Sequence, residues 1–364
     1  MKQIDPLSIR RLLVRATNWV GDAVISVPTL KEIRRLFPNA RISLLVRPWV
    51  HDVYSAVDFV DELLLYHKPG RHTTWNGMRH LAVELRGGSF EMTILLQNAI
   101  EAAMIAFWAH IPIRAGYRCD GRGVLLTHGV PIEPDIHTAH QAYYYLNILS
   151  GIGLLPRRLW ADPAYRLDSL DVGVRASDLE TARRILDTHG VDRARPIIAI
   201  NPGASYGGAK RWPADRFAEV ADALAGEFRT RVLIFGAPAE EEVAREVVSR
   251  MKSPPVILAG RTTLGQLMGL LKECDLFITN DSGPMHIAAA LNVPQLAIFG
   301  STSEIATGPL SPQARVLKNP VDCNPCFLRE CPTDFCCMLG ISVQRVREAA
   351  VEKLSQSAKI RQGG

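Results

Sequence analysis

The chain of 364 residues lacks the features that would place it within a membrane or on a nucleic acid. No stretch reaches the roughly 18 to 20 apolar residues needed to cross a bilayer. The nearest candidate, residues 102–113, is too short and contains His110. Basic residues are scattered along the chain, so we expect no nucleic-acid partner. Residues 1–6 show neither an apolar signal core nor a small-residue cleavage site, and we therefore expect a cytoplasmic protein.

Cysteine is scarce outside one segment, because five of the seven cysteines lie between Cys323 and Cys337. In a cytosolic chain such a cluster indicates reduced thiols or a metal site rather than disulfides. Cys323 and Cys326 have a spacing that zinc sites use, and Cys331 and Cys336 could complete a four-thiolate site, although the later gaps are not the usual second pair. The sequence leaves three alternatives open: a structural zinc, redox-labile thiols or plain reduced cysteines.

The remaining composition is that of an ordinary globular protein, with 47% apolar and 22% charged residues. A net charge of +5 suits anionic ligands or an anionic membrane surface without specifying either. A chain of this length exceeds what one hydrophobic core usually supports. Apolar strand-like runs alternate with helical patterns, which is typical of parallel sheets built from βαβ units. We therefore expect an α/β protein with two Rossmann-like domains that face a central cleft.

The domain boundary is expected within residues 154–177, where prolines, charged residues and weak periodicity indicate a linker. This gives domains of residues 1–170 and 171–364, the second carrying the cysteine-rich segment 323–337 and a terminal helix. Expected strands cover residues 11–15, 41–46 and 92–96 in the first half and 197–200, 232–235, 256–258, 276–279 and 295–299 in the second. Expected helices cover residues 24–36, 214–228, 240–251 and 343–354.

The most informative segment, residues 280–286, lies between a strand and a helical pattern. The free amides of a helix's first turn carry the positive end of the helix dipole, and Gly283 lets the backbone approach a ligand closely. We therefore expect a nucleotide diphosphate here. His286 either fills space or donates a hydrogen bond to a phosphate oxygen.

A second loop, residues 201–213, follows the first expected strand of the second half. Its glycines, a hydroxyl and the pair Lys210 and Arg211 form a plausible anion cradle, although neither a Walker loop nor a dinucleotide-binding glycine fingerprint is present. The alternative is a flexible surface loop with solvated cations. Lys210 is the better partner for an anion, since Arg211 beside it should point elsewhere.

Carboxylates follow two other expected strands. Asp22 comes after the first strand, where it could act as a general base, or it could simply cap the following helix. Glu240, Glu241 and Glu242 begin a helix, where carboxylates favour the helix dipole. One of these three could instead bind ribose hydroxyls, as acidic residues do in dinucleotide folds.

Three motifs follow one another along the chain. They are Trp19-Val20-Gly21-Asp22, then Pro202-Gly203-Ala204 through Ala209-Lys210-Arg211-Trp212-Pro213, and finally Asn280-Asp281-Ser282-Gly283-Pro284-Met285-His286 with the helix that follows. In this order they resemble the family 9 glycosyltransferases, the ADP-heptose:lipopolysaccharide heptosyltransferases, and are most similar to the type II enzymes. The resemblance covers nearly the whole chain, and the cysteine cluster is its departure from the best-known members.

The resemblance implies a GT-B fold and an inverting transfer that requires no metal or other cofactor. The acceptor would bind the first domain and ADP-heptose the second. Carried over by motif position, the implied roles are Asp22 as the catalytic base, Ser205 and Lys210 at the diphosphate, Glu240 at the ribose, Asp281 at the heptose hydroxyls, and Ser282, Gly283 and His286 on the phosphate side of the donor.

The expected activity is transfer of heptose from ADP-L-glycero-D-manno-heptose to the first heptose of the lipopolysaccharide inner core. The enzyme would work at the cytoplasmic face of the inner membrane as a peripheral protein. Two alternatives stand beside this one: a GT-B transferase or epimerase that uses another nucleotide sugar, and a non-catalytic protein that binds a nucleotide sugar.

Overall fold

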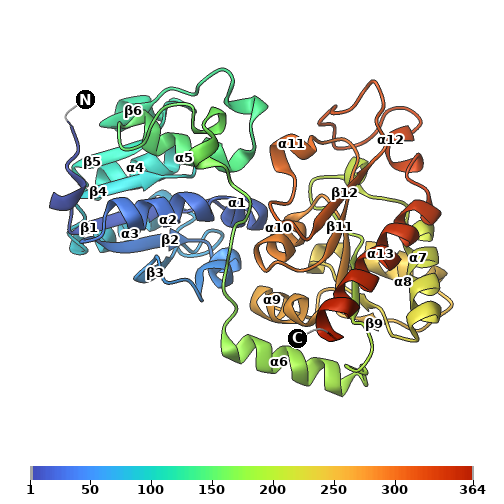
Figure 1. The fold of residues 1–364 in the computed structure, drawn as a ribbon. Coiled ribbons are helices and arrows are strands. Elements are labelled where there is room, and N and C mark those ends of the chain that lie inside the picture. The colour runs from blue at the N-terminus through green and yellow to red at the C-terminus, as the bar shows by residue number, and fades with distance from the viewer. Residues whose placement is uncertain (1–2, 363–364) are drawn as a thin grey trace. The chain divides into compact units, whose positions relative to one another are not determined.

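The computed structural model describes residues 3–362, except for the side chains of residues 357–362. It divides into two compact units, Met1–Leu167 and Asp168–Gly364, each built on one parallel six-stranded sheet with helices on its faces (Figure 1). The expected α/β class with two parallel sheets is confirmed. Among the described residues, no helix combines the length and the apolar character that a membrane span requires.

The sheet of the first unit has the strand order β3-β2-β1-β4-β5-β6. Its central strands are almost completely buried because helices cover both faces of a parallel sheet. Helices α3 and α4 pack on one face, where Leu81 and Ile105 join a core with Leu13 and Leu95. The elements are β1 (Arg11–Arg15), α1 (Val20–Ile25), α2 (Val27–Leu36), β2 (Arg41–Val46), β3 (Glu62–Leu65), α3 (Trp75–Gly87), β4 (Met92–Leu95), α4 (Ile100–Trp108), β5 (Ile113–Tyr117), β6 (His128–Val130) and α5 (Gln141–Gly151).

The expected helix over residues 24–36 is wrong in its extent, because the structure has two helices here that divide at Ser26. Pro28 has no backbone N–H, so it cannot continue a helical ladder from α1, but it fits the first turn of α2. Strands β3, β5 and β6 had no clear sequence signal, since they are short and carry mixed residue types.

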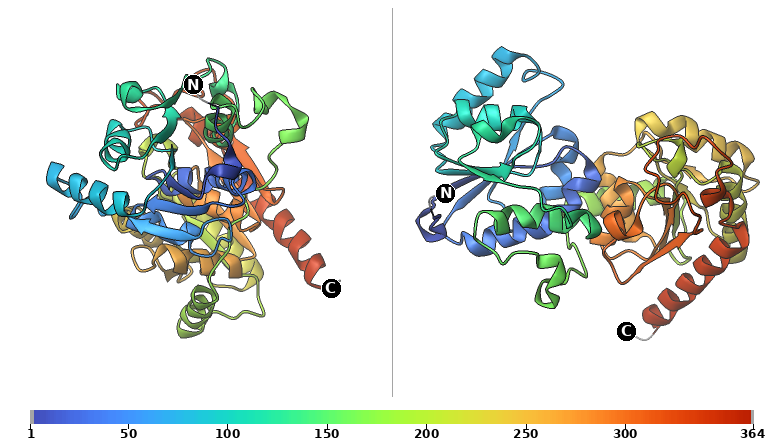
Figure 2. Two further views of the ribbon diagram at one scale, coloured as in Figure 1. Left: turned by 90° about the vertical axis from the view of Figure 1, so that its left-hand side faces the viewer. Right: turned by 90° about the horizontal axis from the view of Figure 1, so that it is seen from above.

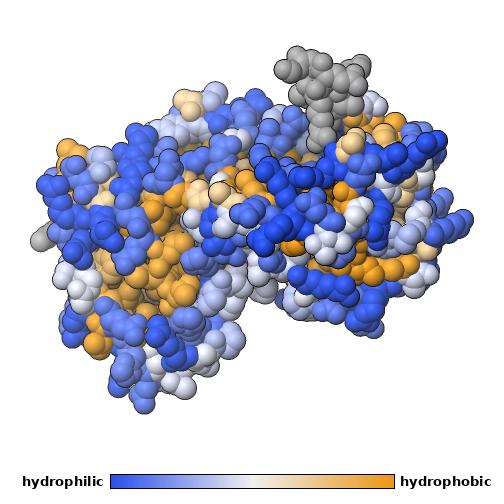
Figure 3. All heavy atoms as spheres, turned by 90° about the horizontal axis from the view of Figure 1, so that it is seen from below, coloured by the Kyte–Doolittle hydropathy of each residue, from blue (hydrophilic) through white to orange (hydrophobic). Residues whose placement is uncertain are grey.

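The edge strand β3 leaves its three leucines only partly covered. Seen from below, the first unit has an apolar area bordered by hydrophilic residues (Figure 3). In both views of Figure 2, α3 (light blue) lies at the outer side of this unit. The first unit therefore exposes apolar as well as charged surface beyond its buried core.

The sheet of the second unit has the strand order β12-β11-β10-β7-β8-β9. The terminal helix α13 belongs to this unit, because Val346 and Leu354 join the core of the sheet and of α7. The elements are α6 (Ala176–Thr188), β7 (Ile198–Asn201), α7 (Ala214–Phe228), β8 (Leu233–Ile234), α8 (Glu241–Arg250), β9 (Val256–Ile257), α9 (Leu264–Glu273), β10 (Leu276–Asn280), α10 (Gly283–Ala290), β11 (Gln295–Phe299), α11 (Glu304–Thr307), β12 (Ala314–Lys318), α12 (Cys336–Leu339) and α13 (Val343–Gln362).

The strand order of the second sheet reverses between β7 and β10. From β7 the chain proceeds outward to β8 and β9, and it then returns to place β10 on the other side of β7. The two strands pair directly, with Thr279 opposite Asn201. Loops that leave neighbouring strands at such a reversal diverge and leave room for a ligand at the carboxyl ends. The loops that start at residues 202 and 281 leave the sheet at this point.

Candidate functional site

Lys210 and Asp281 form a buried ion pair at the strand-order reversal of the second unit. Lys210 lies in the loop after β7 and Asp281 directly after β10, and Lys210 Nζ is 2.5 Å from Asp281 Oδ2. Their side chains are only 13% and 4% exposed. Thr302, which follows β11, donates its hydroxyl to the same carboxylate oxygen at 2.6 Å. Arg211 turns elsewhere, and its Nη2 donates to Ala204 O. Three strand ends thus converge on one carboxylate.

The glycine-rich loop is held in place by the cysteine-rich segment. Gly208 N donates to Glu330 Oε1 at 3.0 Å, and Ala209 N donates to Arg329 O at 2.9 Å. The hydroxyl of Tyr206 donates to Phe327 O at 2.6 Å. A Cβ on Gly207 would lie 2.3 Å from Arg329 O, so the two backbones meet at a distance that only glycine permits. These contacts hold the loop in place, so it is not the flexible surface loop that the sequence left open as an alternative.

Glu240 and Ser205 meet at the end of β8. Glu240 is 6% exposed, accepts a hydrogen bond from Ala237 N at 2.9 Å and lies 3.3 Å from the Ser205 hydroxyl, which donates to it. Gly203 lies against this carboxylate, because a Cβ there would be 2.3 Å from Glu240 Cδ. Glu241 begins α8, where its charge favours the helix dipole. Of the three neighbouring acidic residues, Glu240 is thus the one that faces the candidate site.

The amino terminus of α10 completes the site on the second unit. Ser282 is its N-cap residue and Gly283 its first residue, while His286 is 4% exposed in the first turn. Asn280 joins the two site loops, since its Nδ2 donates to Pro202 O at 2.8 Å and its Oδ1 accepts from Trp212 N at 3.0 Å. The structure therefore brings all seven residues that were expected to bind the sugar donor, from Ser205 to His286, to the carboxyl ends of β7, β8 and β10.

Sequence reasoning gave no role to three residues of this site, Thr302, Asn280 and Tyr206, although the last two lie within segments that it singled out. The ring of Tyr206 lies 4.9 Å from Lys210 Nζ, a distance at which a cation and a π face attract each other. Thr302 had a usable signal, because it comes shortly after the apolar run of β11 and hence at the same edge of the sheet. The contact between Tyr206 and Lys210 had none, since it depends on the path of the loop.

In the first unit, Asp22 lies in α1 and faces the buried hydroxyl of Tyr145 from α5. Burial raises the pKa of Tyr145 well above its ordinary value, and the charge of Asp22 and a hydrogen bond with its carboxylate raise it further. The expectation that Asp22 could be an N-cap residue is wrong, because Trp19 occupies that position and Asp22 is the third helical residue. The helix begins earlier than its apolar pattern does.

The loop that precedes α1, the helix of Asp22, is clamped by side chains from β1 and from the segment after β2. Arg15 Nη2 donates to Asn18 Oδ1 at 2.8 Å, and Arg47 Nε donates to the same oxygen at 3.2 Å. Trp49 Nε1 donates to Asn18 O at 2.7 Å. Burial, together with the charge of Arg47, lowers the pKa of Arg15 to about 10. This clamp fixes the start of α1 and therefore the position of Asp22.

Glu101 balances part of the positive charge beside this clamp. It forms an ion pair with Lys68, accepts the hydroxyl of Tyr66 at 2.6 Å and lies 3.6 Å from Arg47 Nη2. Burial by itself raises the pKa of Glu101, but the hydrogen bonds from Lys68 and Tyr66 outweigh it and hold the pKa below its ordinary value. Glu101 is therefore held as a carboxylate.

The cysteine-rich segment carries free thiols. Within residues 3–362, no group of three or more His, Cys, Asp and Glu side chains is arranged to hold a metal ion. The structure therefore gives no support to a zinc site of Cys323, Cys326, Cys331 and Cys336. The segment instead contributes backbone contacts to the glycine-rich loop.

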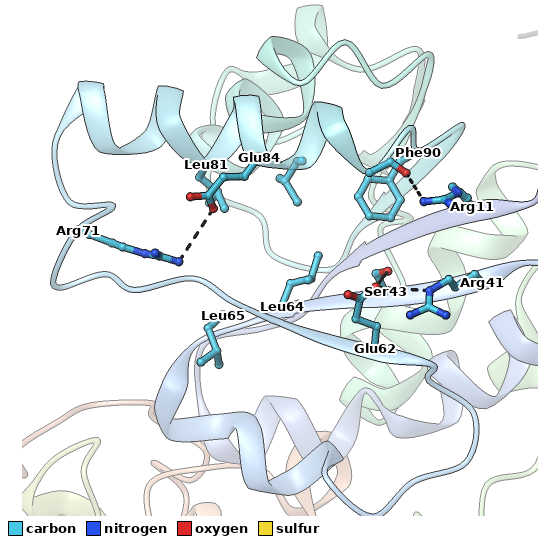
Figure 4. A pocket seen from close by; sticks show the side chains of 12 residues that line it. Arg11, Arg41, Ser43, Glu62, Leu64, Leu65, Arg71, Leu81, Glu84 and Phe90 are labelled. Atoms are coloured by element: carbon cyan, nitrogen blue, oxygen red, sulfur yellow. Dashed lines mark hydrogen bonds and ion pairs between the residues drawn. The ribbon is translucent and has the colours of Figure 1, made fainter.

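A cavity of about 310 Å³ lies in the first unit between α3 and the edge of the sheet (Figure 4). Arg11, Arg41 and Glu62 line it from the first residues of β1, β2 and β3. Ligands of open α/β sheets collect at the carboxyl ends of the strands, whereas these residues lie at the amino ends. The cavity is therefore separate from the site that contains Asp22.

The chain is similar to known proteins over most of its length. The model of glycosyltransferase family 9 (heptosyltransferase) matches residues 78–336. The chain is 30% identical to lipopolysaccharide heptosyltransferase 2 of Salmonella typhimurium, over 85% of this chain and 88% of that protein. Its identity to lipooligosaccharide heptosyltransferase 2 of Haemophilus influenzae is also 30%, over 84% and 88% of the two chains.

Two solved structures share the fold over almost their whole length. The structure of E. coli ADP-heptose lps heptosyltransferase II has a TM-score of 0.79 and 26% identity, and the match covers 96% of this chain and 99% of that one. The glycosyl transferase family 9 structure from Veillonella parvula has a TM-score of 0.84 and 26% identity, with coverage of 98% and 100%.

Proposed function

Because the chain belongs to glycosyltransferase family 9, the heptosyltransferases, we propose that it transfers heptose from ADP-L-glycero-D-manno-heptose to the first heptose of the lipopolysaccharide inner core. The observation that carries the proposal is the convergence of Lys210, Asp281 and the amino terminus of α10 at the strand-order reversal. The names of the type 2 relatives, matched over most of both chains, support the transfer of heptose to a lipopolysaccharide or lipooligosaccharide acceptor.

The second unit would bind the donor. The diphosphate would accept hydrogen bonds from Lys210, Ser205, Ser282, His286 and the backbone at Gly283, because cations and helix amides favour an anion at this point. The charge of Lys210 is matched by Asp281. Arrival of the diphosphate would share Lys210 between two anions, which would leave Asp281 free to accept heptose hydroxyls.

Glu240 would bind the adenosine ribose with its carboxylate. Its Oε2 already accepts a backbone hydrogen bond, whereas its Oε1 accepts the longer bond from Ser205. A carboxylate oxygen has two lone pairs, so Oε1 can accept a ribose hydroxyl as well. Ser205 could then turn toward the diphosphate without leaving the carboxylate unsatisfied.

The first unit would bind the acceptor and supply the base. The acceptor hydroxyl oxygen would form the new bond to the anomeric carbon and lose its proton to Asp22. The bond from that carbon to the diphosphate oxygen would break on the opposite face, so the configuration would invert. The electron pair would leave with ADP, whose growing charge Lys210 and the α10 amides would stabilise. In this scheme the protein itself supplies the positive charge, and no metal or other cofactor is required.

The test is a mass-spectrometric transfer assay with ADP-heptose and two acceptors, a core without heptose and a core with one heptose. Transfer only to the second acceptor is expected, and transfer only to the first would make the chain a type I enzyme. Consumption of the donor without any acceptor would favour the epimerase alternative. Binding of ADP-heptose with no conversion would favour the non-catalytic alternative.

We place the reaction at the cytoplasmic face of the inner membrane, where the protein would be peripheral.

A further inference from the structure

A broad hollow of about 520 Å³ opens at the surface of the first unit along α3 and the end of α4. Arg79 and Arg86 line it from α3, Phe107 and Trp108 from α4, and Arg114 from β5. Its lining contains no carboxylate. We call these five residues, together with Trp75 at the start of α3, the basic aromatic face.

Large apolar side chains of the basic aromatic face and of Val83 beside it are exposed to an unusual extent. Trp75 is 61% exposed and Phe107 is 48% exposed, and Val83 between the two arginines of α3 is 61% exposed. Trp75 also packs on Trp108, with ring centroids 5.6 Å apart. Large apolar groups that gather on one surface usually mark a contact with a partner or a membrane.

Two of the three arginines of this face lie on its aromatic rings. The guanidinium of Arg79 is 5.6 Å from the ring centroid of Trp108, and that of Arg114 is 5.4 Å from the centroid of Phe107. Such pairs present an apolar body and a charged head side by side. This combination matches the boundary between lipid headgroups and acyl chains, where aromatic residues and arginine are both favoured.

The positive charge of the face is not balanced by its own helices. Helices α3 and α4 contain two acidic residues, Glu84 and Glu101. Glu84 points toward Arg71, at 4.0 Å, on the side of the cavity in Figure 4, and Glu101 is bound by Lys68 and Tyr66. Neither carboxylate lines the hollow. The charge of this face therefore complements an anionic surface.

We propose that the basic aromatic face docks the first unit on an anionic phospholipid bilayer. Its arginines would contact the headgroups while Trp75 and Phe107 enter the interfacial layer. Each basic residue near an anionic lipid surface is attracted to it and adds to the binding free energy. This attraction falls off within a Debye length, so added salt weakens the binding. The proposal names the contact surface and does not depend on which sugar the enzyme transfers.

The first test is co-sedimentation of the intact protein with vesicles. Binding to an equimolar mixture of phosphatidylcholine and phosphatidylglycerol is expected, with little binding to phosphatidylcholine alone and a progressive loss as salt is added. Equal binding to both vesicle types, or binding to neither, would overturn the proposal. This comparison uses the unaltered chain, so no folding defect can obscure it.

The second test compares two double variants of equal net charge. Arg79→Gln with Arg86→Gln should weaken binding to the anionic vesicles about fivefold for each arginine, or roughly 25-fold together. The control, Arg157→Gln with Arg261→Gln, removes two exposed arginines that lie outside the face and should bind almost as tightly as the parent. An equal loss in both variants would show that net charge alone decides binding, and the proposal would fail.

A third variant, Trp75→Ser, separates the aromatic contribution from the charge. It should weaken binding to anionic vesicles without changing the slope of the salt dependence, because no charge is lost. Unchanged binding would remove Trp75 from the docking surface. The melting temperature and the ADP affinity, measured on every variant, should both stay at the parental values. The first measurement shows that the altered unit is still folded, and the second keeps a failure of docking distinct from a failure of the proposed transfer.

Discussion

Lys210 and Asp281 meet at 2.5 Å across the loops of β7 and β10, in a pair that is almost withdrawn from water. Removing one partner of a buried pair leaves the other charge uncompensated, at a cost of roughly 3 to 5 kcal/mol. The same pair occupies the point at which the proposed donor would place its diphosphate. Stability and ligand binding therefore depend on these two residues in different ways, and variants can separate the two.

Lys210→Ala should weaken ADP binding by about 1.5 to 3 kcal/mol, which is the value of a charged hydrogen bond. It should also lower the free energy of unfolding, because Asp281 stays buried without its cation. Isothermal titration calorimetry and chemical denaturation measure the two effects. Unchanged ADP affinity would remove Lys210 from the diphosphate site.

The double variant Lys210→Met with Asp281→Asn should recover much of the lost stability, since no buried charge remains. It should not recover ADP affinity, because the positive charge is still missing. Asp281→Asn alone should keep or strengthen ADP binding, because Lys210 no longer has a competing anion. A variant whose ADP affinity followed its stability would contradict this separation.

Asp22→Ala should lower kcat by roughly 100-fold or more while donor affinity stays nearly intact, because the base acts on the acceptor hydroxyl. Steady-state kinetics with the heptose-bearing acceptor, together with ADP titration, test this. Glu32→Gln in α2, where the carboxylate pairs with Arg35, is a control that removes a carboxylate from the same unit. An active Asp22→Ala enzyme would exclude Asp22 as the base.

Tyr145→Phe tests how Asp22 is held. Tyr145 shares a hydrogen bond with the Asp22 carboxylate, so its loss should leave that carboxylate less well oriented toward the acceptor. We expect kcat to fall, whereas ADP affinity should stay at the parental value because the donor would bind the second unit. A parental kcat would show that Tyr145 does not position Asp22.

Gly207→Ala should displace the glycine-rich loop, because the new Cβ would lie 2.3 Å from Arg329 O. We expect weaker ADP binding, since Lys210 lies at the end of the same loop. Gly226→Ala in α7 is the control: its Cβ would meet no atom within 4 Å, and alanine favours a helix. Equal ADP affinity in the two variants would show that the cysteine-rich segment does not position the loop.

The lowered pKa of Glu101 predicts that the free energy of unfolding depends on pH. The pKa of Glu101 is lower in the folded chain than in the unfolded chain, where it is near 4.5. The contribution of Glu101 to the free energy of unfolding is therefore present above the unfolded pKa and is lost as the pH falls through the folded pKa. Glu101→Gln should therefore unfold more easily than the parent at neutral pH, by roughly 1 to 3 kcal/mol. The difference should shrink in acid. Denaturation curves across this range test the sign, and a difference that grew in acid would contradict it.

Much of the fold could be predicted because long elements have clear periods. The expected helix over residues 214–228 is α7, and the buried runs of β1, β2 and β11 have the expected bounds. The four-residue edge strand β3 lacked such a pattern. The break at Ser26 also escaped prediction, because the apolar period continues across it while the backbone ladder does not.

The sequence by itself determined which residue types stand at the strand ends, since a strand that breaks into a glycine-containing loop is a local pattern. It therefore indicated Asp22, Lys210 and Asp281. Only the tertiary structure decided what those side chains touch: Lys210 meets Asp281, Glu240 meets Ser205, and Asp22 meets Tyr145. These partners are between 35 and about 120 residues apart in the sequence. No local period encodes such pairs, because strand order in the sheet and helix packing on its faces bring them together.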